Sequence, residues 1–180
     1  MPQMEIRKKN KINKSSCYLA NFAENITSQN GEDGVIRKIF EIMPPTNKFC
    51  VEFGAWNGVH LSNTFSLVQR EEWNALLIEG DENKFGELKA NYINSSRVKT
   101  LDRYIDFDKN SLDNILSEHN APPKLGLISI DVDGNDWHIW NLLENFYPQL
   151  IIIEFNPTIP NDVYFVQDQN PLVNHGCSLL

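Results

Sequence analysis

The sequence has few cysteines and no long apolar run. Its 180 residues include three cysteines, Cys17, Cys50 and Cys177, and no CxxC pair. An odd and sparse set of this kind excludes a disulfide scaffold and is typical of a reducing compartment. No window approaches the ~18 consecutive apolar residues of a membrane span. No apolar stretch follows the basic N-terminus, so we expect no secretory signal and a cytoplasmic protein.

Positive charge is scarce outside the first residues. The formal net charge is −8. Five of the 16 cations and one of the 24 acids lie in residues 1–14, which leaves 11 cations against 23 acids, a net charge of −12. An acidic body of this kind excludes nucleic-acid binding, which depends on cations that neutralise phosphates. We predict a basic polar arm over residues 1–28 and one domain over residues 29–180.

Strand-like and helix-like patterns alternate along this domain. Short apolar runs predict strands near residues 49–53, 75–79, 97–104, 126–131 and 150–155. Helical spacing of apolar residues falls between them, at 36–43, 61–68, 85–92, 112–116 and 139–146. Asp81 and Ser111 are suitable N-caps for the third and fourth helices. The pattern predicts a Rossmann-like α/β fold with an open parallel sheet in the order 3-2-1-4-5. The chain ends early for such a sheet, so we expect its last strands to be missing.

Acidic side chains stand at the end of every predicted strand. In open parallel sheets, ligands bind beyond the carboxyl ends of the strands, so we expect the functional site there. The acids at these ends are Glu52, Glu79, Asp102, Asp131 and Glu154.

A glycine-rich loop follows the first strand. Gly54 and Gly58 allow a sharp turn and a close approach of the backbone to a ligand, although a tight turn without a ligand is the alternative. No GK[ST] follows, which excludes a P-loop, and Trp56 stands where a dinucleotide fingerprint requires glycine. Glu79, 25 residues after Gly54, is placed to accept hydrogen bonds from a ribose diol. A nucleoside without pyrophosphate fits this pair, and S-adenosylmethionine is the commonest such cofactor.

Several motifs together resemble the FkbM-type family of S-adenosylmethionine-dependent methyltransferases, over about residues 28–156. They are Ser28-Gln29-Asn30-Gly31-Glu32-Asp33, Glu52-Phe53-Gly54-Ala55-Trp56-Asn57-Gly58, Ile78-Glu79-Gly80, Ser129-Ile130-Asp131-Val132-Asp133-Gly134 and Ile153-Glu154. Gly80 replaces a proline and Ser129 a lysine of the family pattern, which indicates an uncharacterised branch. The resemblance implies a methyltransferase-type sheet and cofactor binding by Gln29, Glu52, Gly54, Ala55, Trp56, Gly58, Glu79, Gly80 and Asp102.

The acids of residues 131–136 have three interpretations. Asp131 and Asp133 could be catalytic, lying near the transferred methyl group and acting as base or orienting group. Alternatively Asp131, Asp133, Glu154 and Asn156 could hold a divalent metal such as magnesium, which prefers oxygen ligands. Thirdly, Asn135 or Asp136 could cap the following helix while Asp133 fills a turn.

These observations predict methyl transfer from S-adenosylmethionine to an oxygen of a small-molecule or sugar acceptor. An NAD-binding oxidoreductase is the alternative enzyme, which Trp56 disfavours. A methyltransferase-like domain that binds a ligand without catalysis is the alternative non-enzyme. The sequence leaves open the identity of the acceptor and the oligomeric state.

Overall fold

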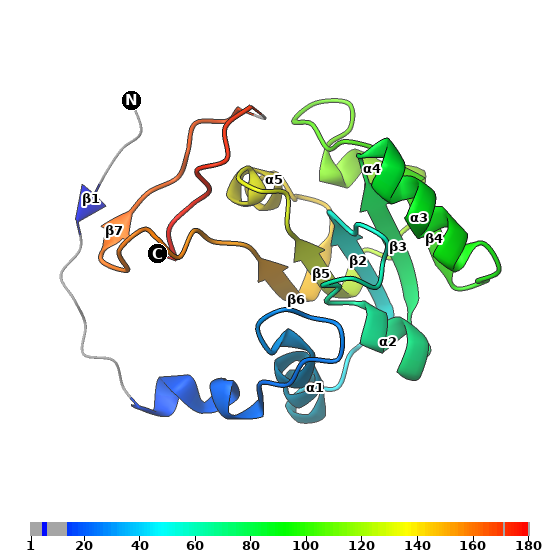
Figure 1. Ribbon diagram of the computed structural model, residues 1–180, viewed down its shortest axis with the longest axis horizontal. Coiled ribbons are helices and arrows are strands. Elements are labelled where there is room, and N and C mark those ends of the chain that lie inside the picture. The colour runs from blue at the N-terminus through cyan, green and yellow to red at the C-terminus, as the bar shows by residue number, and fades with distance from the viewer. Residues whose placement is uncertain (1–4, 7–13, 171, 180) are drawn as a thin grey trace.

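The computed structural model describes residues 5–6, 14–170 and 172–179. Its centre is a five-stranded, fully parallel sheet with the order β4-β3-β2-β5-β6 (Figure 1). Numbered along the sheet-forming part of the chain, this is the predicted order 3-2-1-4-5, so the Rossmann-like α/β fold is confirmed. The strands are β2 (Phe49–Phe53), β3 (Asn74–Glu79), β4 (Val98–Asp102), β5 (Lys124–Ile130) and β6 (Tyr147–Ile153).

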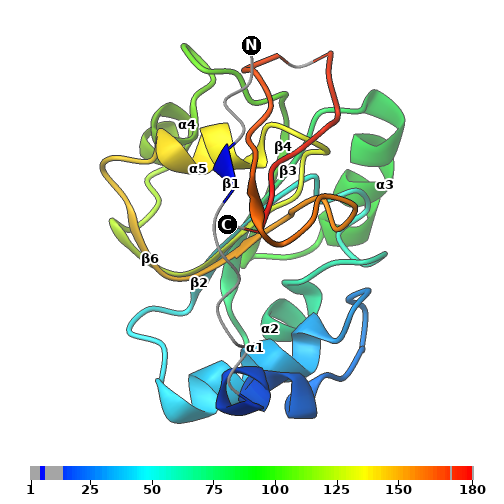
Figure 2. The same ribbon diagram turned by 90° about the vertical axis from the view of Figure 1, so that its left-hand side faces the viewer.

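Helices cover both faces of the sheet, as the crossover connections require (Figure 2). They are α1 (Glu32–Ile42), α2 (Phe65–Arg70), α3 (Glu82–Tyr92), α4 (Leu112–Glu118) and α5 (Asp136–Asn141). Successive residues of β2 point to opposite faces: Cys50 belongs to the core shared with α1, α2 and α3, and Val51 to the core shared with α4 and α5. Both cores are apolar, which explains the uninterrupted apolar runs of the central strands.

Two predicted N-caps are confirmed. The Asp81 carboxylate accepts hydrogen bonds from the backbone amides of Asn83 and Lys84, each at 3.0 Å. The Ser111 hydroxyl accepts a hydrogen bond from the Asn114 amide. These side chains satisfy amides that have no partner within their own helices.

Two helices are shorter than their apolar spacing predicted. The second begins at Phe65, because Leu61 has a φ of +57° and residues 62–64 turn toward the Glu52 carboxylate instead. The fifth ends at Asn141, because the Asp113 carboxylate accepts hydrogen bonds from the amides of Glu144 and Asn145 and fixes a turn there. Local hydrogen bonds to carboxylates outweigh the apolar pattern in both cases.

The regions that flank the sheet contain short elements. A 3₁₀ helix, η1, covers Lys14–Phe22, and β1 (Glu5–Ile6) pairs antiparallel with β7 (Val163–Tyr164). Asp33 of α1 accepts hydrogen bonds from the amides of residues 26–28, so the end of the predicted arm is tied to the domain. The boundary at residue 28 stays a prediction. None of the described helices has the length and apolar character that a membrane crossing requires.

Candidate functional site

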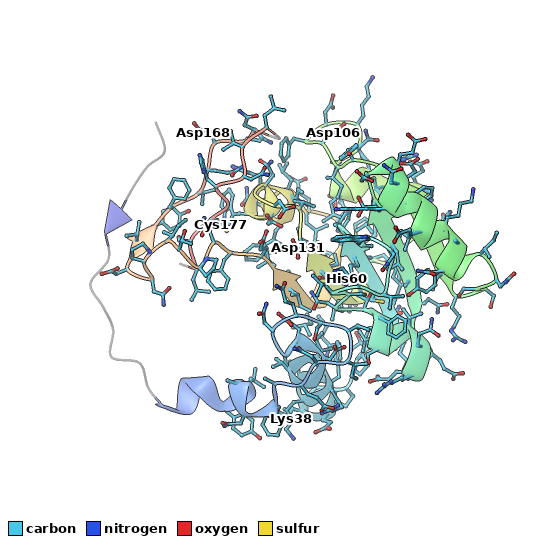
Figure 3. The ribbon with its side chains drawn as sticks, viewed as in Figure 1. Lys38, His60, Asp106, Asp131, Asp168 and Cys177 are labelled. Carbon is cyan, nitrogen blue, oxygen red and sulfur yellow. The ribbon has the colours of Figure 1, made fainter. Side chains whose placement is uncertain are left out.

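A cavity of about 500 Å³ opens beyond the carboxyl ends of the parallel strands. Its volume is in the range of pockets that enclose small ligands. Figure 3 shows Asp131 and His60, which both line it, in the middle of the molecule. The position is the one that strand order and chain direction predict for a ligand site.

Most of the predicted site residues line this cavity. From the cofactor set they are Gln29, Glu52, Gly54, Ala55, Trp56, Glu79 and Gly80, and from the acidic set Asp131, Asp133 and Glu154. The lining therefore combines residues from widely separated parts of the sequence at one edge of the sheet.

Gly58 and Asp102 do not line the cavity. A Cβ atom at Gly58 would lie 2.4 Å from Tyr92 Cε2 and 2.8 Å from Leu88 Cδ1, so the glycine makes room for α3 and not for a ligand. Asp102 is exposed at the end of β4, and the residues directly after it, Arg103 and Tyr104, line the cavity instead.

Gly54 fixes the approach of the glycine loop to the end of β5. Its φ is +68°, and a Cβ atom there would lie 2.0 Å from the carbonyl oxygen of Asp131. Any side chain would push these two strand ends apart. Glycine is thus required here for the contact between the ends of β2 and β5. That contact brings the glycine-rich loop after β2 next to the acidic loop after β5.

Glu79 is held rigidly at the edge of the cavity. Only 7% of the residue is exposed. Its Oε2 accepts a hydrogen bond from the Trp56 amide and its Oε1 one from the Asp81 amide, both at 2.8 Å. A carboxylate has about four acceptor positions, two on each oxygen. Each Glu79 oxygen therefore keeps one position for a ligand, and the two together match a vicinal diol.

Glu52 has a different role from Glu79. Its buried carboxylate accepts hydrogen bonds from the Ser62 and Thr64 hydroxyls at 2.7 Å and from the Asn63 amide at 2.8 Å. Burial raises the pKa of Glu52, while these hydrogen bonds act in the opposite direction. The side chain mainly orders residues 62–64, of which Ser62 and Asn63 line the cavity.

Ser129 is a buried polar residue of β5 beside the cavity wall. The residue is 1% exposed, and its hydroxyl accepts a hydrogen bond from the Asn63 side chain at 3.0 Å. A lysine in this place would need a partner for a buried charge. Serine instead ties β5 to the loop that Glu52 orders.

Aromatic and basic side chains form the rim of the cavity, and of these only Trp56 belongs to the predicted cofactor set. Lys84 Nζ lies 4.3 Å from the centre of the Trp56 ring, and His60 packs edge-on against that ring at 4.8 Å. The Tyr104 ring covers Gly80, where a Cβ atom would lie 2.5 Å from the ring. A side chain at position 80 would therefore clash with this ring. The rule that ligands lie after strand ends could have identified Tyr104 beyond β4.

Asp131, Asp133 and Glu154 form an acidic cluster on the floor of the site. One carboxylate oxygen from each lies within 4.8 Å of the others. Enclosure and the nearby carboxylates of Asp136 and Asp133 raise the pKa of Asp131 to about 6. Burial and the same group of acids raise the pKa of Glu154 to about 7. The site therefore carries a concentrated negative potential that favours cations and hydrogen-bond donors.

The predicted metal set is assembled only in part. The Asn156 amide is engaged elsewhere: Oδ1 accepts hydrogen bonds from the Thr158 amide and hydroxyl, and Nδ2 donates to the His175 carbonyl. Asn156 is therefore not a ligand of the cluster, which corrects that part of the prediction. The three carboxylates have the oxygen chemistry that magnesium prefers, and water would have to complete its octahedral shell. A metal at this place stays a prediction.

The structural interpretation holds for Asp133, which occupies a turn with a φ of +56°, but not for the helix cap, because no side chain caps α5. Asp136 is buried, and its carboxylate accepts hydrogen bonds from the amides of Val132 and Gly134, each at 2.9 Å. Asn135 precedes α5 without capping it, because its side chain bonds to Gln167 and Asn170. The motif thus contains two residues that shape the loop and two whose carboxylates face the cavity.

No protein-family model and no curated protein matches the sequence. Among solved structures, the chain is similar to the N-terminal domain of EvdMO1 with SAH bound, with 14% identity and a TM-score of 0.44. The match covers 66% of this chain and 48% of that domain, so the chain spans about half of its length. The same domain in the presence of SAH and D-fucose gives 15% identity and a TM-score of 0.44, over 66% of this chain and 49% of that domain. Full EvdMO1 gives 17% identity and a TM-score of 0.40, over 67% of this chain and 27% of that one.

Proposed function

We propose that the protein binds S-adenosylmethionine and transfers its methyl group to an oxygen of a small-molecule or sugar acceptor. The observation that carries the proposal is the Glu79 carboxylate, buried and fixed by two backbone amides, with one acceptor position free on each oxygen. A ribose diol presents two hydroxyl donors at the spacing of such a carboxylate. With the ribose at Glu79, the rest of the cavity extends to the acidic cluster that contains Asp131.

The shape of the glycine loop supports a nucleoside without pyrophosphate. Trp56 has a φ of +47°, and its side chain forms part of the rim with Lys84 and His60. In a dinucleotide site, a glycine at this place lets the backbone reach the pyrophosphate. The acidic floor adds a second obstacle, because carboxylates repel a diphosphate. Trp56 on one side of the cavity and the acidic floor on the other therefore both disfavour the NAD-binding oxidoreductase.

When bound, S-adenosylmethionine supplies an electrophilic methyl group on a sulfonium. The residues of the chain then have to position an acceptor hydroxyl, exclude water and take a proton. We assign the proton to Asp131, which lies on the cavity floor, with Asp133 as the orienting group. With a pKa of about 6, Asp131 is mostly ionised at pH 7 and able to accept that proton.

Substitution of Glu79 tests the proposal. A hydrogen bond to a charged group is worth about 1.5–3 kcal/mol, so Glu79→Ala should weaken S-adenosylmethionine binding by roughly 10- to 150-fold. Glu79→Gln should lose less, because its amide oxygen remains an acceptor. Calorimetric titration with S-adenosylmethionine, S-adenosylhomocysteine and NAD measures these effects.

Glu144→Ala is the matched control, since Glu144 is an exposed glutamate outside the cavity. It should leave every affinity unchanged. A folded Glu79→Ala protein that binds S-adenosylmethionine as tightly as the parent would remove the proposal. Tight binding of NAD by the parent, lost on the same substitution, would establish the oxidoreductase alternative in its place.

A further inference from the structure

A second, smaller cavity of about 130 Å³ adjoins the proposed cofactor cavity. Asp133 and Glu154 line both cavities, so the two spaces meet at these carboxylates. The walls of the second cavity come from the residues after β6, including Phe155, and from residues 174–176 near the end of the chain. A molecule in the second cavity would therefore face the contents of the first across Asp133 and Glu154.

The distal wall of the second cavity is a fixed part of the fold. Gln167, 3% exposed, accepts hydrogen bonds from the amides of His175 and Gly176 through Oε1, at 2.7 and 2.8 Å. Its Nε2 donates to the Val173 carbonyl at 2.7 Å and to the Asn135 side chain at 3.2 Å. One buried amide thus fastens residues 173–176 to the start of α5.

Gly134 is adapted to the same wall. A Cβ atom there would lie 2.9 Å from both Gln167 Oε1 and the Val173 carbonyl oxygen. The loop after β5 and the segment near the end of the chain therefore pack as a unit. Residues of both segments line the second cavity, together with Glu154.

The ionisable side chains of the second cavity are three acids, Asp133, Asp136 and Glu154, and one histidine, His175. Asp136 uses its oxygens for the amides of Val132 and Gly134, and the Asn156 amide is engaged as described above. No lysine or arginine of the described residues lines the cavity. The residues at the junction of the two cavities are both acidic, Asp133 and Glu154. An anion would be repelled there.

We propose that the second cavity receives the methyl acceptor, and that the acceptor is a small alcohol without negative charge. The inference rests on the proposed function, because it places the donor of the methyl group in the first cavity. The O–H of the acceptor donates a hydrogen bond to Glu154 or Asp133 at the junction. A lone pair of that oxygen forms the bond to the methyl carbon, and the electrons of the broken S–C bond stay on sulfur. The proton passes to the carboxylate cluster of Asp131, Asp133 and Glu154, in which Asp131 is the base assigned above.

Filling the second cavity tests the inference. His175→Trp places a large ring in the distal wall, away from the first cavity, and should leave S-adenosylmethionine affinity unchanged within about twofold. Gln169→Trp is the control, because Gln169 is exposed on the same segment and lines neither cavity. Saturation-transfer NMR on the full chain with S-adenosylhomocysteine then compares three sugars of one ring size: D-glucosamine, D-glucose and D-glucuronate.

We expect saturation-transfer signals from glucosamine, glucose or both, and none from glucuronate. His175→Trp should lower the affinity for the sugars that bind by about tenfold, and Gln169→Trp should leave it unchanged. Glucosamine carries an ammonium group at neutral pH, so the carboxylates of Asp133 and Glu154 should bind it at least as tightly as glucose. Binding of glucuronate as tight as that of the other sugars, binding that His175→Trp does not weaken, or no binding of any of the three would overturn the inference. Calorimetry with S-adenosylmethionine on the same samples distinguishes failure of this inference from failure of the proposed function. If the parent binds no S-adenosylmethionine, the proposed function itself has failed.

Discussion

At the scale of single residues, glycines mark where backbones and rings must approach closely. Gly58 is the position whose role changes most between sequence and structure. The spacing Gly54-x-x-x-Gly58 predicted that both glycines face a ligand, but Gly58 faces Tyr92 and Leu88 of α3. Sequence spacing alone does not distinguish the two cases, because both need a position without a side chain.

Gly58→Ala should therefore lower stability by about 1–3 kcal/mol, since the added methyl group overpacks the core and Gly58 has a φ of +73°. Gly86→Ala is the opposite case, because nothing lies within 4 Å of its Cβ position in α3. It should raise stability by about 0.5–1 kcal/mol. Urea unfolding followed by circular dichroism measures both. Equal effects of the two substitutions would contradict the packing role of Gly58.

The carboxyl of Glu154 should make stability depend on pH. Its pKa is raised from 4.5 to about 7 in the folded protein, so the folded state holds a proton that the unfolded state has already lost. The free energy of unfolding should therefore fall as the pH rises from about 4.5 to about 7. Glu154→Gln should flatten that slope and be more stable than the parent at pH 7. Glu144→Gln, an exposed glutamate, should keep the slope, and urea titrations between pH 4 and pH 8 are the measurement.

At the scale of elements, strands and caps were predictable because they depend on near neighbours in the sequence. Apolar runs such as Leu76-Leu77-Ile78 have to be buried on both faces, which only the interior of a parallel sheet provides. The helix boundaries at Phe65 and Asn141 were predicted wrongly, because the side chains that set them, Glu52 and Asp113, come from other elements. Gln167 was not predicted, because nothing in its local sequence reveals an amide that fastens a distant loop.

The cap of α3 offers a prediction at this scale. Asp81→Ala removes the acceptor for the amides of Asn83 and Lys84 and should cost about 0.5–2 kcal/mol of stability. Asp81→Asn keeps a side-chain acceptor and should cost much less. Thermal melts of the three proteins decide the matter, and an Asn variant as unstable as the Ala variant would show that charge, rather than hydrogen bonding, is what the helix start requires.

At the scale of the whole molecule, the order of the strands determined where the site lies. The strand order places β2 between β3 and β5, so the ends that carry Glu79, Gly54 and Asp131 meet at the centre of one edge. The sequence was sufficient for this arrangement, because parallel pairing requires every carboxyl end to point the same way. It was not sufficient for the second cavity, whose distal wall depends on contacts between residues more than 30 positions apart, such as Asn135 and Gln167.

The central position of β2 also has a kinetic consequence. Cys50 pairs with Ala75 on one side and with Leu127 on the other, so the second pairing has to wait for a much longer loop to close. During synthesis, β2, β3 and β4 leave the ribosome well before β5 and β6. We therefore expect the half-sheet with Glu79 to form early, and the contact between Gly54 and Asp131, which closes the site, to form late. A cofactor that binds only the closed site would act on that last step, drawing the nearly complete chain into its native state by mass action.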